Sequence, residues 1–290
     1  MSFALYTDGC SNLPGALLNS LNIRVMPFTY YLDGEPVEYD GDIETFDYTK
    51  FYGSLRAGKM VTTSLANIQS FIDHFRKALE QGLDVVYVGL SSGISGTVQS
   101  ALAAAAELQK EFSDRVIRVV DSMGAGLGTG LLTCMGADLR SEGLDARAVA
   151  DRLDQARMRL CEFFTVGDLA FLGRTGRISQ TAAKLGSLLH IKPMLRGDEE
   201  GHIVPCGKYR GRKKVVDAIV EKYRTKVVDP ENSRVAISHG DCLEEAQELA
   251  DRICEIARPK ELILCPHEPV TGSHVGPGML SLFFFGDNRK

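Results

Sequence analysis

The sequence predicts an α/β protein of two lobes: an N-terminal α/β lobe with a mainly parallel sheet (residues 1–165) and a C-terminal α+β lobe (residues 166–290). Up to about Val166, short apolar runs alternate with stretches of helical periodicity, which is typical of βαβ units. Beyond it, hairpins and helices are mixed. The 290 residues suit two lobes of ordinary domain size, and we expect the boundary within residues 165–175.

The first lobe alternates strands and helices. Strands are expected where β-branched and aromatic residues form short apolar runs, at Phe3–Thr7, Arg24–Leu32, Val37–Tyr39, Leu83–Leu90 and Val116–Val120. The turn Asp33-Gly34 favours a hairpin between the second and third of these runs. Helices are expected at Pro14–Leu21, Ile68–Leu79 and Thr97–Glu111, with another after the glycine-rich turn that follows Val120.

The second lobe begins with a predicted hairpin around the turn Asp198-Glu199-Glu200-Gly201. Its strands are expected at Ile191–Leu195 and His202–Cys206, followed by strands at Val235–Ser238 and Leu262–Cys265. Helices are expected at Lys213–Tyr223 and Leu243–Ile256.

The composition excludes several classes of protein. The net charge of -5 and the pI of about 5.7 are unlike those of a nucleic-acid-binding protein. The seven cysteines are scattered without a C-x-x-C pair, which indicates free thiols rather than disulfides or a zinc site. Neither a secretory leader nor an apolar run of about 18 residues occurs, so we expect a cytoplasmic protein without a transmembrane segment.

Polar turns follow three of the predicted strands: Asp8 to Ser11, Ser91 to Thr97, and Asp121 to Gly124. In open parallel sheets, ligands bind at the carboxyl ends of the strands. Ser91-Ser92-Gly93-Ile94-Ser95-Gly96-Thr97 is the strongest candidate, because Gly96 permits close backbone approach and a helix start at Thr97 favours an anion. The alternative is that these side chains only cap a helix or form an ordinary turn.

Three other segments carry candidate residues. Thr62-Thr63-Ser64 precedes a helix and could bind a ligand or merely cap that helix. His274 lies in the tight turn Gly272 to Gly278, where its ring could face a ligand, although a lone histidine is usually structural. The basic segment Lys208 to Lys214, with Arg174 and Arg177, is either a solvated surface or a source of cations for an anion or an acidic partner.

Known catalytic and nucleotide-binding motifs are absent. The P-loop, the dinucleotide fingerprint, the nucleophile elbow and the H-E-x-x-H zinc motif do not occur. A serine-type hydrolase of a small ester or phosphate, with Ser95 or Ser91 as nucleophile, His274, and Asp8 or Asp121, stays open as the alternative function. A third alternative is a regulatory protein that binds a small molecule other than a lipid.

Seven motifs occur in order over nearly the whole chain. They are Thr7-Asp8 with Leu13-Pro14, Thr63-Ser64, Ser91 to Ala101, Val120-Asp121-Ser122, Gly176 to Ser179, Arg210 to Lys214, and His274 to Gly278. Each alone is weak, but the ordered set is specific. Through these motifs the chain resembles the DegV family of bacterial fatty-acid-binding proteins.

The resemblance implies a carrier that buries a long acyl chain, such as palmitate, without any cofactor. Thr63 and Ser95 would hydrogen-bond the carboxylate, with His274 close by and Arg210 as a further candidate. The other site residues of the matched motifs are Ser64 and Gly96 at the carboxylate, and Asp8, Ser92, Thr97 and Asp121 in the surrounding loops.

The resemblance also implies a partner. A separate ATP-dependent fatty-acid kinase would phosphorylate the bound fatty acid to an acyl-phosphate for phospholipid synthesis, so the carrier itself would not be an enzyme. Membrane contact would be at most transient. The chain departs from the family pattern at Gly9, Asn12, Ala66-Asn67 and Gly126, which affects the first loops rather than the carboxylate-binding residues.

Overall fold

The computed structural model describes residues 3–183 and 191–290, and within them the chain forms three sheets. The first sheet has the strand order β2-β1-β6-β7, and all of its neighbouring strands are parallel. Its strands are β1 (Phe3–Asp8), β2 (Ile23–Met26), β6 (Asp84–Gly89) and β7 (Ile117–Asp121).

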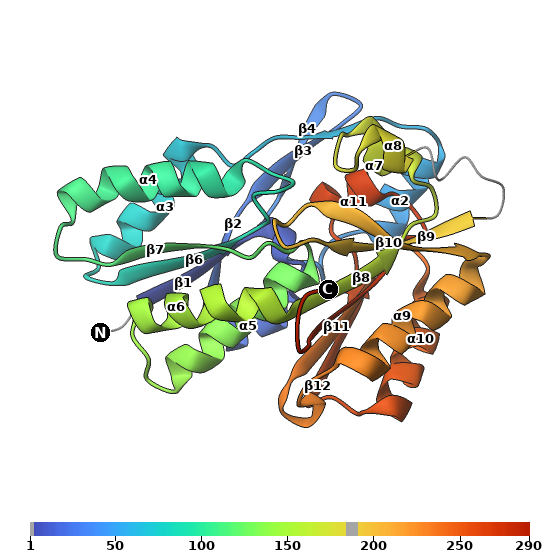
Figure 1. Ribbon diagram of the computed structural model, residues 1–290. Coiled ribbons are helices and arrows are strands. Elements are labelled where there is room, and N and C mark those ends of the chain that lie inside the picture. Colours follow the sequence, from blue (N-terminus) through green and yellow to red (C-terminus); the bar gives the residue numbers. More distant parts are fainter. Residues whose placement is uncertain (1–2, 184–190) are drawn as a thin grey trace.

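Helices cover both faces of this parallel sheet (Figure 1). Helices α3 (Ile68–Leu79) and α4 (Thr97–Glu111) lie on one face, and α5 (Leu127–Ser141) and α6 (Ala146–Ala156) lie on the other. The buried run of β6 alternates accordingly: Val85 and Tyr87 pack with α3 and α4, whereas Val86 and Val88 pack with α5 and α6. A strand buried on both faces requires the continuous apolar run that the sequence shows.

The second sheet has six strands in the order β10-β9-β8-β13-β11-β12. Its strands are β8 (Leu160–Thr165), β9 (Ile191–Gly197), β10 (Ile203–Arg210), β11 (Arg234–His239), β12 (Glu261–Pro266) and β13 (Leu280–Phe285). Among the strands that the structure describes in this sheet, β11 and β12 pair in parallel and the other neighbours are antiparallel. Helices α9 (Arg212–Lys226) and α10 (Leu243–Ile256) bury one face of this sheet. The predicted fold class, with a parallel sheet followed by a mixed α+β part, is confirmed.

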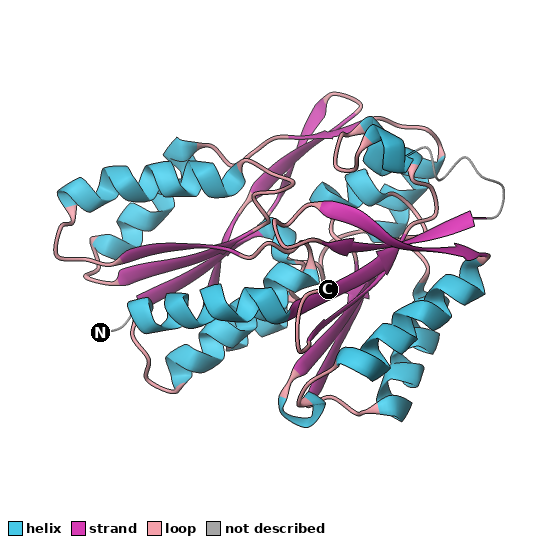
Figure 2. Ribbon diagram, in the orientation of Figure 1, coloured by secondary structure: helices cyan, strands magenta, loops and turns pink. Residues whose placement is uncertain are grey.

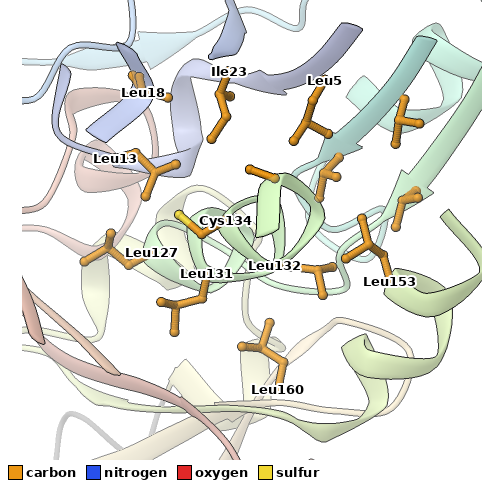
Figure 3. Packing of buried hydrophobic residues seen from close by; sticks show 14 of the residues in the cluster. Leu5, Leu13, Leu18, Ile23, Leu127, Leu131, Leu132, Cys134, Leu153 and Leu160 are labelled. Carbon is orange, nitrogen blue, oxygen red and sulfur yellow. The ribbon is translucent and has the colours of Figure 1, made fainter. Parts of the chain in front are cut away.

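Helix α5 lies between the two larger sheets. Figure 3 shows its residues Leu131 and Leu132 between Leu5 of the parallel sheet and Leu160 at the start of β8. These side chains belong to one buried cluster that also includes Phe283 of β13. The two larger sheets therefore share one hydrophobic core.

A third, small sheet has the order β4-β3-β5 and is antiparallel. Its strands are β3 (Phe28–Leu32), β4 (Glu35–Tyr39) and β5 (Val61–Thr63). The predicted hairpin at Asp33-Gly34 is confirmed, and both residues have the positive φ that a type I′ turn requires. The single predicted strand Arg24–Leu32 is wrong, because Pro27 has no N–H to donate and the chain passes there from β2 to β3.

The shorter helices connect these layers. They are η1 (Gly9–Ser11), α1 (Gly15–Ser20), α2 (Tyr48–Arg56), η2 (Arg157–Arg159), α7 (Ala170–Arg174), α8 (Gln180–Ala183), η4 (Pro230–Asn232) and α11 (Pro269–Val275). No helix within the described ranges is both long and apolar enough to cross a membrane.

The division into lobes stays a prediction. The predicted boundary leaves β8 in the first lobe, yet this strand pairs with β13 and β9 in the six-stranded sheet. Sheet membership thus favours a boundary before Leu160. Figure 2 shows the loops after β6 and β7 directed towards this second sheet, and Ser91 in the first of them donates a hydrogen bond to the Gly201 carbonyl at 2.8 Å.

Candidate functional site

The candidate site is a cavity of about 530 Å³, lined from the six-stranded sheet, from the small sheet, and from the loops that follow β6 and β7 of the parallel sheet. Cavities of about 300–1,000 Å³ are typical of small-molecule sites. The apolar lining residues are Phe28, Leu65, Leu90, Ile94, Met123, Ala125, Phe164, Leu172, Ile203, Val270, Val275, Met279 and Phe283. An interior of this kind suits a ligand with a large nonpolar part better than a small polar molecule.

A hydroxyl and an imidazole meet at one part of the wall. Thr63 ends β5 and His274 lies in α11, and the Thr63 Oγ1 and His274 Nε2 atoms are 3.1 Å apart. Beside them, Ser64 donates to the Thr29 carbonyl at 3.2 Å. All three predicted residues line the cavity.

The electrostatic state of His274 follows from its burial. Burial, together with the nearby Arg177 guanidinium, lowers the pKa of His274 to about 4. The ring is therefore neutral near pH 7. Its buried Nδ1 has no hydrogen-bond partner among the described residues, so the ring retains polar capacity that Thr63 does not use.

The predicted hydroxyl-rich loop forms another part of the wall. Ser92, Ser95 and Gly96 line the cavity, and Ser95 Oγ lies 3.0 Å from Thr97 Oγ1 at the start of α4. A side chain at Gly96 would have its Cβ 3.2 Å from Leu65, so glycine lets the segment with Thr63 approach closely. The positive end of the α4 dipole therefore faces the same region as Thr63 and His274.

Three predicted loop residues lie behind the wall and do not line it. Asp8 is fully buried, and its Oδ2 accepts hydrogen bonds from Leu90 N at 2.8 Å and Tyr87 Oη at 3.0 Å. Burial raises the pKa of Asp8 to about 6. Asp121 Oδ1 accepts from the backbone of Ser92 at 3.2 Å, and Thr97 is fully buried beneath Ser95. These residues hold the loops that carry the lining side chains.

Arg210 lies elsewhere. It ends β10, an edge strand of the six-stranded sheet, and its side chain is exposed and does not line the cavity. The geometry gives its predicted contact with the carboxylate no support.

Arg177 is a cationic residue beside Thr63 and His274, where it could attract an anionic group of a ligand. It lines the cavity and also an adjacent cleft of about 500 Å³, which shares Thr63 and His274 with the cavity. This cleft opens to the protein surface, and Met60 in its wall is 69% exposed. Arg174 lines the cleft as well. The Thr63–His274 pair thus lies where the cavity adjoins an open, positively charged cleft.

Several other polar residues that the sequence does not single out line the cavity. His267 is fully buried between Ser238 Oγ at 2.9 Å and Thr271 Oγ1 at 2.8 Å, and burial lowers its pKa to about 3. Glu162 lines the cavity from β8 and pairs with Arg289. A single histidine or glutamate beside an apolar run gives no signal of a site, because only tertiary contacts bring it to the cavity.

Two of the positions that depart from the family pattern support the segment before α11. Asn12 donates from Nδ2 to the Pro266 carbonyl at 2.9 Å and accepts from Glu268 N at 2.5 Å. Gly126 has a φ of 55°, and a Cβ there would lie 2.7 Å from the ring of His267. Both positions therefore contact the segment that leads into α11, the helix that carries His274.

The geometry gives no specific support to a serine hydrolase. Ser95 pairs with Thr97, and Ser91 donates to a backbone carbonyl. Within residues 3–183 and 191–290, neither serine hydrogen-bonds to a histidine. The same residues contain no group of three or more His, Cys, Asp or Glu side chains arranged to hold a metal.

Known proteins match the chain over its full length. The sequence model of the DegV family, described as a family of uncharacterised proteins, matches residues 2–287. A DegV domain-containing protein from Clostridium perfringens is 35% identical over 289 residues, covering 99% of each chain. The chain belongs to the DegV family. The resemblance drawn from seven short motifs is thereby confirmed.

Solved structures of DegV proteins share the fold. A DegV protein from Thermus thermophilus, described as fatty-acid binding, superposes with a TM-score of 0.88 at 32% identity, covering 99% of this chain and 100% of that one. DegV from Bacillus subtilis, described as a fatty-acid-binding protein, gives a TM-score of 0.83 at 28% identity, with 99% and 100% coverage.

Proposed function

We propose that this DegV protein is a fatty-acid carrier that buries a long acyl chain in the cavity. The carboxylate would be held by Thr63, Ser95 and His274, with Ser64 and Gly96 beside them. The observation that carries the proposal is an apolar cavity whose hydroxyl and imidazole groups lie where it adjoins an open cleft.

The polar groups suit a carboxylate that must stay accessible. A buried carboxylate is costly unless it is hydrogen-bonded or paired. When the neutral His274 ring donates from Nε2 to Thr63 Oγ1, the Thr63 and Ser95 hydroxyls are free to donate hydrogen bonds to the carboxylate, and Arg177 adds positive charge nearby. Thr63, His274 and Arg177 also line the open cleft, so a carboxylate held by them would stay accessible from it.

The acyl chain supplies most of the affinity. Burial of each methylene contributes about 0.8 kcal/mol, so a chain of palmitate length offers on the order of 10 kcal/mol before ordering costs. The descriptions of the Thermus and Bacillus relatives as fatty-acid binders support this assignment.

The proposal includes a partner. A separate ATP-dependent kinase would reach the carboxylate through the cleft and phosphorylate it to an acyl-phosphate, while the carrier supplies binding and orientation. Such a kinase needs ATP, so the proposed location is the cytoplasm. The exposed basic segment that includes Arg210 is available to an acidic partner surface.

Gently purified protein should contain a fatty acid that native mass spectrometry detects, and delipidated protein should bind palmitate in a titration. Repeated recovery without lipid, together with no palmitate binding, would refute the carrier function. The kinase step is tested separately, by formation of acyl-phosphate from bound palmitate with ATP and the candidate kinase. Labelling of Ser95 or Ser91 by a fluorophosphonate, with turnover of a generic ester, would instead support a hydrolase.

A further inference from the structure

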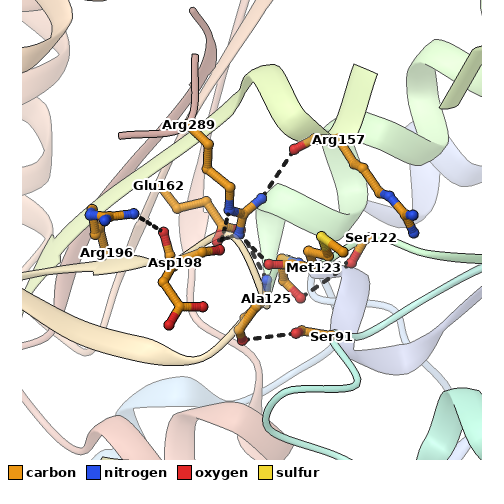
Figure 4. A network of polar contacts seen from close by, with 12 residues as sticks. Ser91, Ser122, Met123, Ala125, Arg157, Glu162, Arg196, Asp198 and Arg289 are labelled. Atoms are coloured by element: carbon orange, nitrogen blue, oxygen red, sulfur yellow. Dashed lines mark hydrogen bonds and ion pairs between the residues drawn. The ribbon is translucent and has the colours of Figure 1, made fainter. Parts of the chain in front are cut away.

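Arg289 forms a buried ion pair at the cavity wall. Its side chain is 1% exposed, and its Nη2 lies 3.1 Å from Oε2 of Glu162, whose side chain is 7% exposed (Figure 4). Two charges removed from water in this way are costly unless further hydrogen bonds satisfy them. The surroundings of the pair supply such bonds.

The guanidinium also binds three backbone carbonyls. Its Nε donates to Asp198 O at 2.8 Å, its Nη1 donates to Arg157 O at 3.1 Å, and its Nη2 donates to Met123 O. These carbonyls belong to the β9–β10 turn, to η2 and to the β7–α5 loop. The planar fork of an arginine can join three such segments, whereas a lysine ammonium cannot span them in the same way.

The Glu162 carboxylate is enclosed just as closely. Its Oε1 accepts from Ala125 N at 3.0 Å. A Cβ at Gly128 would lie 1.9 Å from Oε1, and a Cβ at Gly197 would lie 2.8 Å from Oε2 and 2.4 Å from Arg289 Nη2. Only glycines leave room for the pair at these positions.

The segments that Arg289 joins form part of the cavity lining. Met123, Gly197 and Gly201 all line the cavity, as Glu162 does. Met123 has a φ of 53°, a left-handed conformation that is uncommon for its residue type. Hydrogen bonds hold it on both sides, because Asp121 Oδ1 accepts from its N–H at 2.9 Å and Arg289 donates to its carbonyl.

We propose that Arg289 is a positioning residue that fixes this wall of the cavity and thereby sets the acyl-chain preference. The inference rests on the proposed function of fatty-acid binding. A rigid wall discriminates between chains that differ by a methylene, whereas loops released from Arg289 can adjust to several lengths. None of the described bonds of Arg289 reaches Thr63, Ser95 or His274, so its role is separable from carboxylate binding.

The test measures dissociation constants of delipidated protein for laurate, myristate, palmitate, stearate and arachidate. Arg289→Lys keeps the positive charge beside Glu162 but loses the planar guanidinium, whose N–H groups bind the three backbone carbonyls. Lys290→Gln is the matched control, because Lys290 lies next in the chain and its side chain is 73% exposed. The readout is the ratio of affinities between the preferred acid and the next longer one, since a general loss of stability lowers binding of all acids alike.

Successive acids in this series differ by two methylenes. We expect the ratio to fall by about fourfold or more in Arg289→Lys, the worth of one of these two methylenes, and to stay unchanged in Lys290→Gln. An unchanged ratio in folded Arg289→Lys would overturn the inference while leaving fatty-acid binding intact. If Arg289→Lys does not fold, Met123→Ala provides the test. This variant should bind a longer acid most tightly, and an unchanged preferred chain length overturns the inference. Failure of the wild-type protein to bind any acid would overturn the proposed function itself.

Discussion

Replacement of Thr63 by valine tests the carboxylate-binding cluster with the smallest change of shape. Valine keeps the branched side chain and loses only the hydroxyl, whose oxygen lies 3.1 Å from His274 Nε2. In the proposed complex the same hydroxyl donates to the fatty-acid carboxylate. The variant therefore lacks one hydrogen bond to a charged ligand and keeps the acyl cavity.

The size of the effect follows from that bond. A hydrogen bond to a charged group contributes about 1.5–3 kcal/mol, which corresponds to a loss of about 10- to 150-fold in palmitate affinity. The free energy of unfolding of the apo protein should fall by about 1–3 kcal/mol, because the mostly buried His274 ring loses its hydrogen-bond partner at Nε2.

The assay is a titration of delipidated protein with palmitate and, in parallel, with hexadecanol, which has no carboxylate. Thr63→Val should lower the affinity for palmitate far more than that for hexadecanol. Thr62→Val is the matched control, because Thr62 is the neighbouring residue of β5, is exposed and does not line the cavity. Palmitate binding by Thr63→Val at the wild-type affinity would refute the role given to this hydroxyl.

Other predictions concern stability. The pKa of His274 is about 4 in the folded protein, against an ordinary value of 6.5. Between these pH values the native state binds fewer protons than the unfolded chain, so the stability of the protein rises with pH. This group contributes about 3 kcal/mol to that rise. Urea unfolding of His274→Asn should show a correspondingly smaller rise. The pKa of Asp8 is about 6 against 3.8, so the native state keeps a proton that the unfolded chain has lost, and this group lowers stability as pH rises through that window. Asp8→Asn should consequently gain stability with pH more steeply than the wild type, and an equal slope would contradict the burial argument. Gly93→Ala should destabilise the protein by about 1–3 kcal/mol, because its Cβ would lie 2.6 Å from the Gly201 carbonyl carbon. Gly53→Ala, at an open helical position, should stabilise it by about 0.5–1 kcal/mol, and calorimetric melting temperatures measure both changes.

Local patterns were sufficient to predict most elements of the fold. The apolar run of β6 and the periodicity of α4 specify their structure through neighbours in the sequence. The break at Pro27 was missed, because the aromatic and β-branched residues on both sides favour a strand. The pairing of β8 with β13 could not be predicted either, since it joins residues more than a hundred positions apart.

The candidate site was predictable where residues follow strand ends or belong to recognisable motifs. Thr63, Ser95 and His274 were found in this way, and they lie on one cavity. Glu162 and Arg289 were not found, because a glutamate within an apolar strand and an arginine beyond the last strand carry no local signal. Their partnership depends on a tertiary contact across 127 positions.

The position of α5 has a consequence for dissection of the protein. Ten of its fifteen residues are buried, and its side chains complete the core of the parallel sheet and that of the six-stranded sheet at once. A fragment that ends after α6 would expose the face that normally meets β8 and β13, and the complementary fragment would lack a cover for those strands. The two halves are therefore not interchangeable modules, and chimaeras between DegV relatives should exchange α5 together with both sheets that it contacts.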